Sequence, residues 1–189
     1  MMRHLILVRH AQPAIDADIP AAEWTLTDEG KQKSRLLVKS FEQYGVTRVF
    51  TSHEPKAHET GCIPAKLLGL LCEIASDLHE HDRRGEPFHS KQVFMQKLET
   101  FFNQPETQSF GNESAQKAQA RFAAAVDELI KQYPDDTLAI TTHGTVMALY
   151  LAQKCGIDPI PFWKALKSPM VVVLELPEFH LAEVITEFA

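Results

Sequence analysis

Short apolar runs rich in β-branched residues recur at three places along the chain: His4 to Val8, Arg48 to Thr51 and Thr137 to Thr142. Apolar runs of this length predict buried strands. Each run is followed by a segment of helical character, and these segments span Thr27 to Tyr44, Pro55 to Leu71 and Thr145 to Gln153. Strands that alternate with helices favour a parallel sheet with helices on both faces. The pattern therefore predicts a three-layer α/β/α sandwich around a mainly parallel central sheet.

Single residues place the ends of several elements. Thr27 is a suitable N-cap for the first helix, and Gly45 suits its C-terminal end. Two further helices are expected over 91–102 and 113–133, and Pro134 ends the second one. Near the C-terminus, the stretches 170–176 and 180–185 predict a hairpin that turns at Pro177 and adds antiparallel strands at the sheet edge.

Composition is consistent with one domain that covers residues 1–189. A chain of 189 residues with 44% hydrophobic residues can bury a full core. Its formal net charge of −6 argues against nucleic acid or an anionic membrane as a partner, because such partners bind basic surfaces. The run Leu5 to Val8 is too short for a membrane span or the core of a signal peptide. A soluble protein is expected, and its oligomeric state is left open.

The cysteines and the paired histidines give little sign of disulfides or metal sites. Cys62, Cys72 and Cys155 are scattered, odd in number and without a CxxC pair. They are expected to be small buried hydrophobic residues in a reducing cytoplasm, with no disulfide and no cysteine zinc site. The pair His79 and His81 has no further spaced ligands in its loop, so no metal site is expected there.

Polar side chains follow each of the three predicted strands. In open parallel sheets ligands bind at the carboxyl ends of the strands, so these side chains are expected to lie together. Two histidines and several cations at one sheet edge would form an anion site on an otherwise acidic protein, and a phosphate group fits it. A neutral imidazole is a competent nucleophile near pH 7. The side chains are Arg9 and His10 after the first strand, Ser52 and Lys56 after the second, and His143, followed by Gly144, after the third.

These residues fall in segments that resemble, in order, the motifs of the histidine phosphatase superfamily, also called the phosphoglycerate mutase-like family. The resemblance covers nearly the whole chain, and motifs in this order with strand-turn-helix context are specific. The segments are Arg9-His10-Ala11, the helix start Leu26 to Gln32, the segment Thr51 to Thr60, the triplet Leu78-His79-Glu80, Asn112-Glu113-Ser114, and Thr142-His143-Gly144.

The resemblance implies a two-step phosphoryl transfer. His10 would attack the phosphorus of a phosphomonoester, Glu80 would protonate the leaving oxygen, and water would then hydrolyse the phosphohistidine. His143 is expected both to hold phosphate and to take part in catalysis. Fixed cations would neutralise the charge that magnesium neutralises in kinases, so neither a metal nor another cofactor is expected. The expected phosphate-binding residues are Arg9, Lys56, His143, Gly144 and Ser52.

Three departures from the family pattern bear on activity. Ala11 stands where glycine is usual, which a negative φ would permit. Lys56 replaces an arginine and loses the planar fork that grips two phosphate oxygens. Mutase-like members place an asparagine that contacts phosphate in the loop after His10, where this sequence has Gln12 to Asp16, so Asp16 is expected to turn away or to belong to a substrate-selecting loop. Either Arg83 or Arg84 could reach in to compensate for Lys56, although solvated loop charges are the simpler interpretation for both.

Hydrolysis of a phosphomonoester is the preferred function. The dedicated mutases that the chain resembles are longer, with extra segments that close the site. The alternatives are phosphoryl transfer of the phosphoglycerate mutase type, or a catalytically weakened protein that binds a phospho-ligand. The substrate is expected to be a small phosphomonoester or a phosphoprotein, and no rule translates the loop sequences into its identity.

Overall fold

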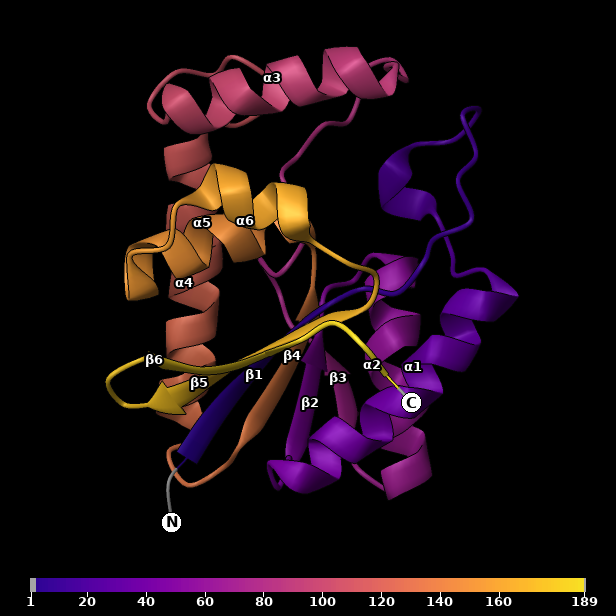
Figure 1. The fold of residues 1–189 in the computed structure, drawn as a ribbon, viewed down its shortest axis with the longest axis vertical. Coiled ribbons are helices and arrows are strands. Elements are labelled where there is room, and N and C mark those ends of the chain that lie inside the picture. The colour runs from indigo at the N-terminus through magenta and orange to yellow at the C-terminus, as the bar shows by residue number, and fades with distance from the viewer. Residues whose placement is uncertain (1–2, 189) are drawn as a thin grey trace.

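A six-stranded sheet forms the centre of the computed structural model, which describes residues 3–188 (Figure 1). The strands are β1 (Arg3–Arg9), β2 (Arg48–Thr51), β3 (Cys72–Ile74), β4 (Leu138–Thr142), β5 (Met170–Leu176) and β6 (His180–Ile185). Their order across the sheet is β3-β2-β4-β1-β5-β6. Strands β1 to β4 run parallel, whereas β5 and β6 are antiparallel additions. This confirms the mainly parallel sheet.

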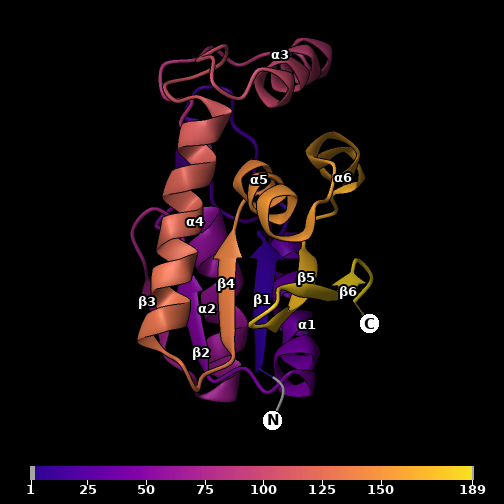
Figure 2. The same cartoon turned by 90° about the vertical axis from the view of Figure 1, so that its left-hand side faces the viewer.

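Helices cover both faces of this sheet. The chain forms α1 (Asp28–Gln43), α2 (Pro55–Leu68), α3 (Lys91–Asn103), α4 (Ala115–Gln132), α5 (Gly144–Cys155) and α6 (Pro159–Ala165), with a 3-10 turn η1 (Ala21–Glu23). Side chains alternate along β1, so Ile6 and Val8 pack with α1 and α2, while Leu5 and Leu7 pack with α4 and α5. The two layers lie on opposite sides of the strands (Figure 2), which confirms the three-layer arrangement.

The predicted element boundaries hold at several points. The Thr27 side chain accepts the Gly30 N–H at the start of α1, and Gly45 after α1 has a φ of 64°. The hairpin of β5 and β6 forms over the expected residues. Strand β5 pairs with β1 along its length, so β6 alone is the outer strand on that side.

Two short elements were not predicted, and one predicted helix is too long. Helix α2 ends at Leu68 because Gly69, with a φ of 69°, caps it in the left-handed region. The apolar residues 70–71 then lead into β3 rather than continuing the helix. Helix α6 is a short helix of 7 residues that begins at Pro159, and the side chain of its N-cap residue Asp158 accepts the Ile160 N–H. Such short segments carry too few periodic positions to be recognised in the sequence.

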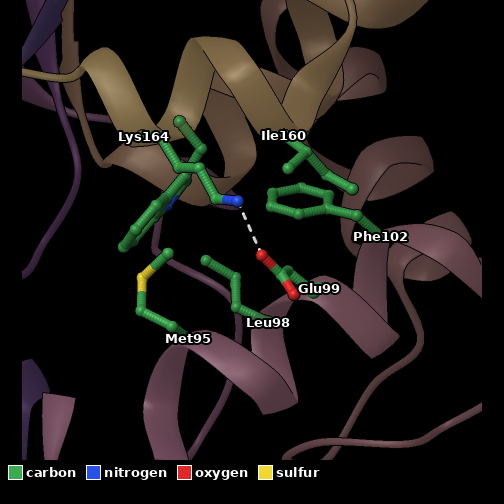
Figure 3. A pocket seen from close by; sticks show the side chains of 7 residues that line it. Met95, Leu98, Glu99, Phe102, Ile160 and Lys164 are labelled. Carbon is green, nitrogen blue, oxygen red and sulfur yellow. Dashed lines mark ion pairs between the residues drawn. The ribbon is translucent and has the colours of Figure 1, made fainter. Parts of the chain in front are cut away.

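Helix α3 lies beyond the strands and contacts α6 across a shallow crevice (Figure 3). An ion pair between Glu99 of α3 and Lys164 of α6 crosses it, with 2.6 Å between the charged atoms. The crevice is otherwise mostly apolar and offers no histidine, so it is a contact between helices and not a catalytic site. Its lining residues are Met95, Leu98, Glu99, Phe102, Ile160, Trp163 and Lys164.

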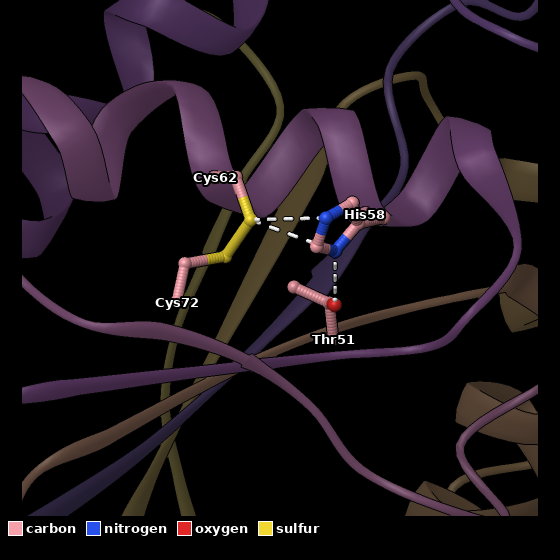
Figure 4. The surroundings of a disulfide bond; sticks show 4 residues. All are labelled: Thr51, His58, Cys62 and Cys72. Carbon is pink, nitrogen blue, oxygen red and sulfur yellow. Dashed lines mark hydrogen bonds between the residues drawn. A yellow bond between two sulfur atoms is a disulfide. The ribbon is translucent and has the colours of Figure 1, made fainter.

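The prediction of three unpaired cysteines is wrong. Cys62 of α2 and Cys72 of β3 form a disulfide, with 5.4 Å between their Cα atoms (Figure 4). The pairing of β3 with β2 brings Cys72 beside Cys62 of α2. The sequence alone does not predict this contact, because β3 is too short to be recognised there. Cys155 is the free cysteine among the described residues, and it is half-buried rather than in the core. The cysteines therefore no longer support a reducing cytoplasm, and a cytoplasmic location stays a prediction.

The carboxyl ends of β1, β2 and β4 meet at one edge of the sheet, below α3 and the 10–27 segment (Figures 1 and 2). Two glycines permit close packing there. A Cβ on Gly30 would come within 2.4 Å of the Gln12 oxygen, and one on Gly61 within 2.5 Å of Thr141 Oγ1. Nowhere in residues 3–188 does a helix combine the length and apolarity that a bilayer crossing requires.

Candidate active site

His10 is the first residue after β1, and its side chain is 7% exposed. Its backbone N–H donates to Thr142 O of the neighbouring strand β4, at 3.0 Å. Its Nδ1 lies 2.8 Å from Ala11 O. A carbonyl oxygen can only accept, so Nδ1 carries the proton and Nε2 keeps its lone pair. The local backbone thus fixes the tautomer that a nucleophile requires.

The expected cations gather around His10. The ring centroids of His10 and His143 are 5.3 Å apart. Burial lowers the pKa of His10 well below its usual value, and the charges of His143, Arg9 and Lys56 lower it further. His10 is therefore neutral at pH 7, and the structure brings together the residues that follow β1, β2 and β4.

Two buried donors beside His10 have no hydrogen-bond partner within residues 3–188: Arg9 Nε and His143 Nδ1. Buried polar atoms in folded proteins nearly always have a partner, so unpaired donors indicate a place for an acceptor. Arg9 is held from the other end, where its Nη1 donates to Lys167 O at 3.0 Å. A Cβ on Gly144 would come within 3.3 Å of Arg9 Nε, so this glycine leaves room for the guanidinium at the start of α5.

Ser52 positions His143. Both side chains are fully buried, and Ser52 Oγ lies 2.9 Å from His143 Nε2. The Ser52 backbone N–H donates to Thr141 O of β4 at 3.0 Å, which places its hydroxyl at the strand ends. Ser52 therefore orients the imidazole of His143, and its predicted contact with phosphate stays a prediction.

Lys56 lies in the first turn of α2 and is 5% exposed. Its ammonium group donates to Ala21 O at 2.6 Å and to Glu54 Oε2 at 2.5 Å. The other oxygen of Glu54 lies 3.5 Å from His143 Nε2. Glu54 was not singled out in the sequence, although it lies inside the segment from Ser52 to Lys56. A carboxylate within a predicted phosphate segment was the signal that could have drawn attention to it.

Glu80 lies at the N-terminus of α5. Thr142 Oγ1 donates to Leu78 O at 2.8 Å and ties this segment to the end of β4. The Glu80 carboxylate accepts the N–H groups of Thr145 and Val146 at 3.1 and 3.2 Å. Burial raises the pKa of Glu80, but the charges of His143 and Arg83 and the backbone N–H groups outweigh it and hold that pKa at about 2. Glu80 is thus ionised at neutral pH in this structure.

Neighbouring candidates for the acid are engaged elsewhere. The His81 ring packs on Phe101 at 4.1 Å between centroids, and its Nε2 lies 2.8 Å from Phe110 O. The carboxylate of Glu86 pairs with His89 and Lys97. Glu80 is the member of this loop that reaches the strand ends.

Arg83 and Arg84 take different roles. Arg84 binds the Asp82 carboxylate with two nitrogens, at 3.0 and 2.7 Å, and is exposed. The Cζ atom of Arg83 lies 4.9 Å from the ring centroid of Phe94 and 5.9 Å from that of Phe110. The charge of Arg83 helps to lower the pKa of Glu80 and of His143, and its side chain has no hydrogen bond or ion pair within the described chain. Arg83 is therefore the loop cation that acts on the site.

Two of the departures from the family pattern can be located. Ala11 is buried outside the left-handed region, and its N–H donates to Thr60 Oγ1 at 2.9 Å. The methyl group therefore introduces no backbone strain. Asp16 lies in an exposed loop, and its Oδ1 accepts the Asp18 N–H at 2.9 Å. Its carboxylate is turned toward its own loop, as expected.

The side chains within residues 3–188 that come close enough to share a metal ion are His58, Cys62 and Cys72. His58 Nδ1 lies 2.9 Å from Thr51 Oγ1 and 3.5 Å from Cys62 Sγ (Figure 4). Both sulfurs belong to the disulfide, so neither is a thiolate ligand in this structure.

Comparisons with known proteins agree with this geometry. A family model described as histidine phosphatase superfamily (branch 1) matches residues 5–179. A search of curated proteins by sequence found no match. The fold is similar to three solved structures, each with a TM-score of 0.74.

The three structures share little sequence with this chain. A mycobacterial glucosyl-3-phosphoglycerate phosphatase is 16% identical, over 93% of this chain and 91% of that one. A phosphoserine phosphatase mutant from Entamoeba histolytica, in complex with phosphoserine, is 15% identical over 97% and 96%. YhfR from Bacillus stearothermophilus is 20% identical over 95% and 94%. At these identities the likeness shows the fold.

Proposed function

The chain belongs to the histidine phosphatase superfamily, and on that premise we propose that it hydrolyses phosphomonoesters through a phosphohistidine on His10. One observation carries the proposal. The hydrogen bond from Nδ1 to Ala11 O leaves the Nε2 lone pair of a neutral imidazole among Arg9, Lys56 and His143. Burial also lowers the pKa of His143 well below its usual value, so Arg9 and Lys56 supply the positive charge that attack on a phosphate dianion requires.

In the first step His10 Nε2 forms a bond to phosphorus, and the bond from phosphorus to the leaving oxygen breaks. Arg9, with its unpaired buried Nε, and His143, with its unpaired Nδ1, would hold non-bridging oxygens. The first N–H groups of α5, beginning at Gly144, add donors at a helix N-terminus.

Glu80 is the proposed proton donor to the leaving oxygen. It is ionised in this structure, and a phosphate dianion bound beside it would raise its pKa by like-charge repulsion. Glu80 takes up a proton from solvent as phosphate binds and passes it to the leaving oxygen. In the second step water attacks phosphorus, its proton passes to the Glu80 carboxylate, and the bond to His10 breaks. As inorganic phosphate leaves, Glu80 releases this proton to solvent and regains its ionised starting state.

The substrate class follows from Arg83. Its guanidinium lies over Phe94 and Phe110 without an acidic partner, at a site that already holds phosphate-binding cations. We propose small phosphomonoesters with a second acidic group, and a phosphoprotein is the alternative substrate. Structures of the Entamoeba histolytica phosphoserine phosphatase contain phosphoserine and 3-phosphoglyceric acid, which both carry a carboxylate.

The second candidate function is a weakly catalytic protein that binds a phospho-ligand. The buried pair of Lys56 with Glu54 favours it, because this pair occupies a cation that catalysis would use. Turnover of a generic aryl phosphate distinguishes the two functions. A hydrolase turns it over, and His10→Ala abolishes the activity. A binding protein retains affinity for inorganic phosphate but shows no turnover that depends on His10.

A further inference from the structure

Glu54 places a buried carboxylate in contact with two of the proposed phosphate ligands. Its side chain is 5% exposed. Oε2 lies 2.5 Å from Lys56 Nζ, and Oε1 lies 3.5 Å from His143 Nε2. Oε1 also accepts the backbone N–H of Glu80 at 2.9 Å. Both oxygens of Glu54 are therefore directed at the groups that surround the reaction centre.

The usual reasons for an acid at this position do not account for Glu54. It is the N-cap residue of α2, yet its side chain makes no capping hydrogen bond to that helix. It is 4% exposed as a residue, so it does not serve as a solvated surface charge. A carboxylate and a phosphate group offer oxygen acceptors of similar kind to the same donors. Glu54 thus holds Lys56 by a contact that a bound phosphate would also make.

Charge balance decides how phosphate and Glu54 share Lys56. Arg9, Lys56 and Arg83 are cations, whereas Glu54 and Glu80 are carboxylates, so the five charges sum to +1 in this structure. A phosphate dianion added to all five would leave a net charge of about −1 in a largely buried site, which low dielectric makes costly. Lys56 can turn to phosphate without losing its place, because its second bond to Ala21 O remains.

On the basis of the proposed function, we infer that Glu54 is a specificity-determining residue that makes phosphate binding an exchange of anions. The incoming phosphoryl group takes Lys56 from the Glu54 carboxylate, and that carboxylate takes Lys56 back when inorganic phosphate leaves. An anion must therefore bind Lys56 better than a buried carboxylate does. The exchange disfavours singly charged anions and weakens inhibition by the product.

The test is calorimetric titration of inorganic phosphate into wild type and Glu54→Gln at neutral pH. Glutamine keeps the acceptor for the Glu80 N–H but removes the competing charge. Phosphate should bind about tenfold more tightly to the variant, because one competing charge in a buried site is worth at least one decade in affinity. KM for an aryl phosphate should fall, and inhibition by phosphate should become stronger.

Two further variants complete the design. Glu59→Gln removes a carboxylate from the same helix, where it pairs with Lys31 at 3.9 Å, and should leave phosphate affinity unchanged. Glu54→Leu removes the charge with an apolar side chain of similar size and should tighten phosphate binding in the same direction. Glu54→Leu replaces Glu54→Gln in the titration if circular dichroism shows that Glu54→Gln does not fold.

Phosphate affinity that is unchanged or weaker in the Glu54 variants would overturn the inference, because Glu54 would then prepare Lys56 for phosphate instead of competing with it. The proposed function fails separately. It fails, and the inference with it, if wild type shows no turnover of aryl phosphate and no phosphate binding that Arg9→Ala removes. If both are present and Glu54→Gln does not tighten binding, the inference alone fails.

Discussion

Replacing Glu80 by glutamine should destabilise the protein at neutral pH and much less so in acid. The carboxylate accepts N–H groups from Thr145, Val146 and His81 at distances from 2.9 to 3.2 Å. Glutamine keeps one acceptor oxygen, but its NH₂ group would face backbone donors at the start of α5. The charge that the helix N-terminus stabilises is also lost.

The magnitude follows from the pKa of Glu80, which is about 2 instead of the usual 4.5. Burial by itself raises the pKa of Glu80, but the nearby charges and backbone N–H groups lower this pKa by more than burial raises it. At about 1.4 kcal/mol per pKa unit, the difference stabilises the folded state by roughly 3 kcal/mol at neutral pH. A group with a depressed pKa stabilises above its unfolded value of 4.5, and the effect is lost as the pH falls toward 2.

Urea denaturation of wild type and Glu80→Gln near pH 6 and near pH 3 measures this effect. The free energy of unfolding of the variant should be lower by up to about 3 kcal/mol near pH 6, and the gap should shrink by about 2 kcal/mol near pH 3. Other titrating groups contribute equally to the free energy of unfolding of both proteins, so their contribution cancels in the difference between wild type and variant. A gap that is close to zero near pH 6, or equal at both pH values, would refute the reasoning.

Three further predictions concern other parts of the molecule. Arg83→Ala should raise KM several-fold for phosphomonoesters with a second acidic group, whereas Arg84→Ala should not; equal effects would contradict the assignment. The pKa of His10 lies well below 6.5, so kcat should not fall with a midpoint near 6.5 as the medium is acidified, and a midpoint there in the pH profile would show an ordinary, exposed histidine. Reduction of the disulfide between Cys62 and Cys72, 10 residues apart, should lower the free energy of unfolding by up to roughly 3 kcal/mol in urea denaturation, and no change would show that the link is dispensable.

The sequence predicted the main strands because β1, β2 and β4 are short runs rich in apolar and β-branched residues, and the structure buries them on both faces. It also predicted that His10 and His143 would meet, since parallel strands place their carboxyl ends at one edge. Strand β3 was missed because it has three residues and is largely exposed. The disulfide was missed with it, because only the pairing of β3 with β2 brings Cys72 to α2.

The parts of the site that could not be predicted depend on where side chains point. Arg83 and Arg84 are adjacent and chemically identical, so the sequence does not distinguish them. In the structure Arg83 lies over the Phe94 and Phe110 rings, whereas Arg84 binds Asp82. The sequence places the Glu54 carboxylate within a predicted phosphate-binding segment, but its pairing with Lys56 depends on where the two side chains point. The sequence thus supplied the strand-end residues, and tertiary contacts determined their partners.

The most direct test of the central claim is to trap the phosphoenzyme and locate its phosphoryl group. Wild type and His10→Ala are mixed with an aryl phosphate, quenched in alkali, which preserves phosphohistidine, and digested for mass spectrometry. We expect a phosphoryl group on the peptide that contains His10, formed and lost at rates that match turnover, and none in His10→Ala. Turnover without that group, or a phosphoryl group on another residue such as His143 or Ser52, would contradict it.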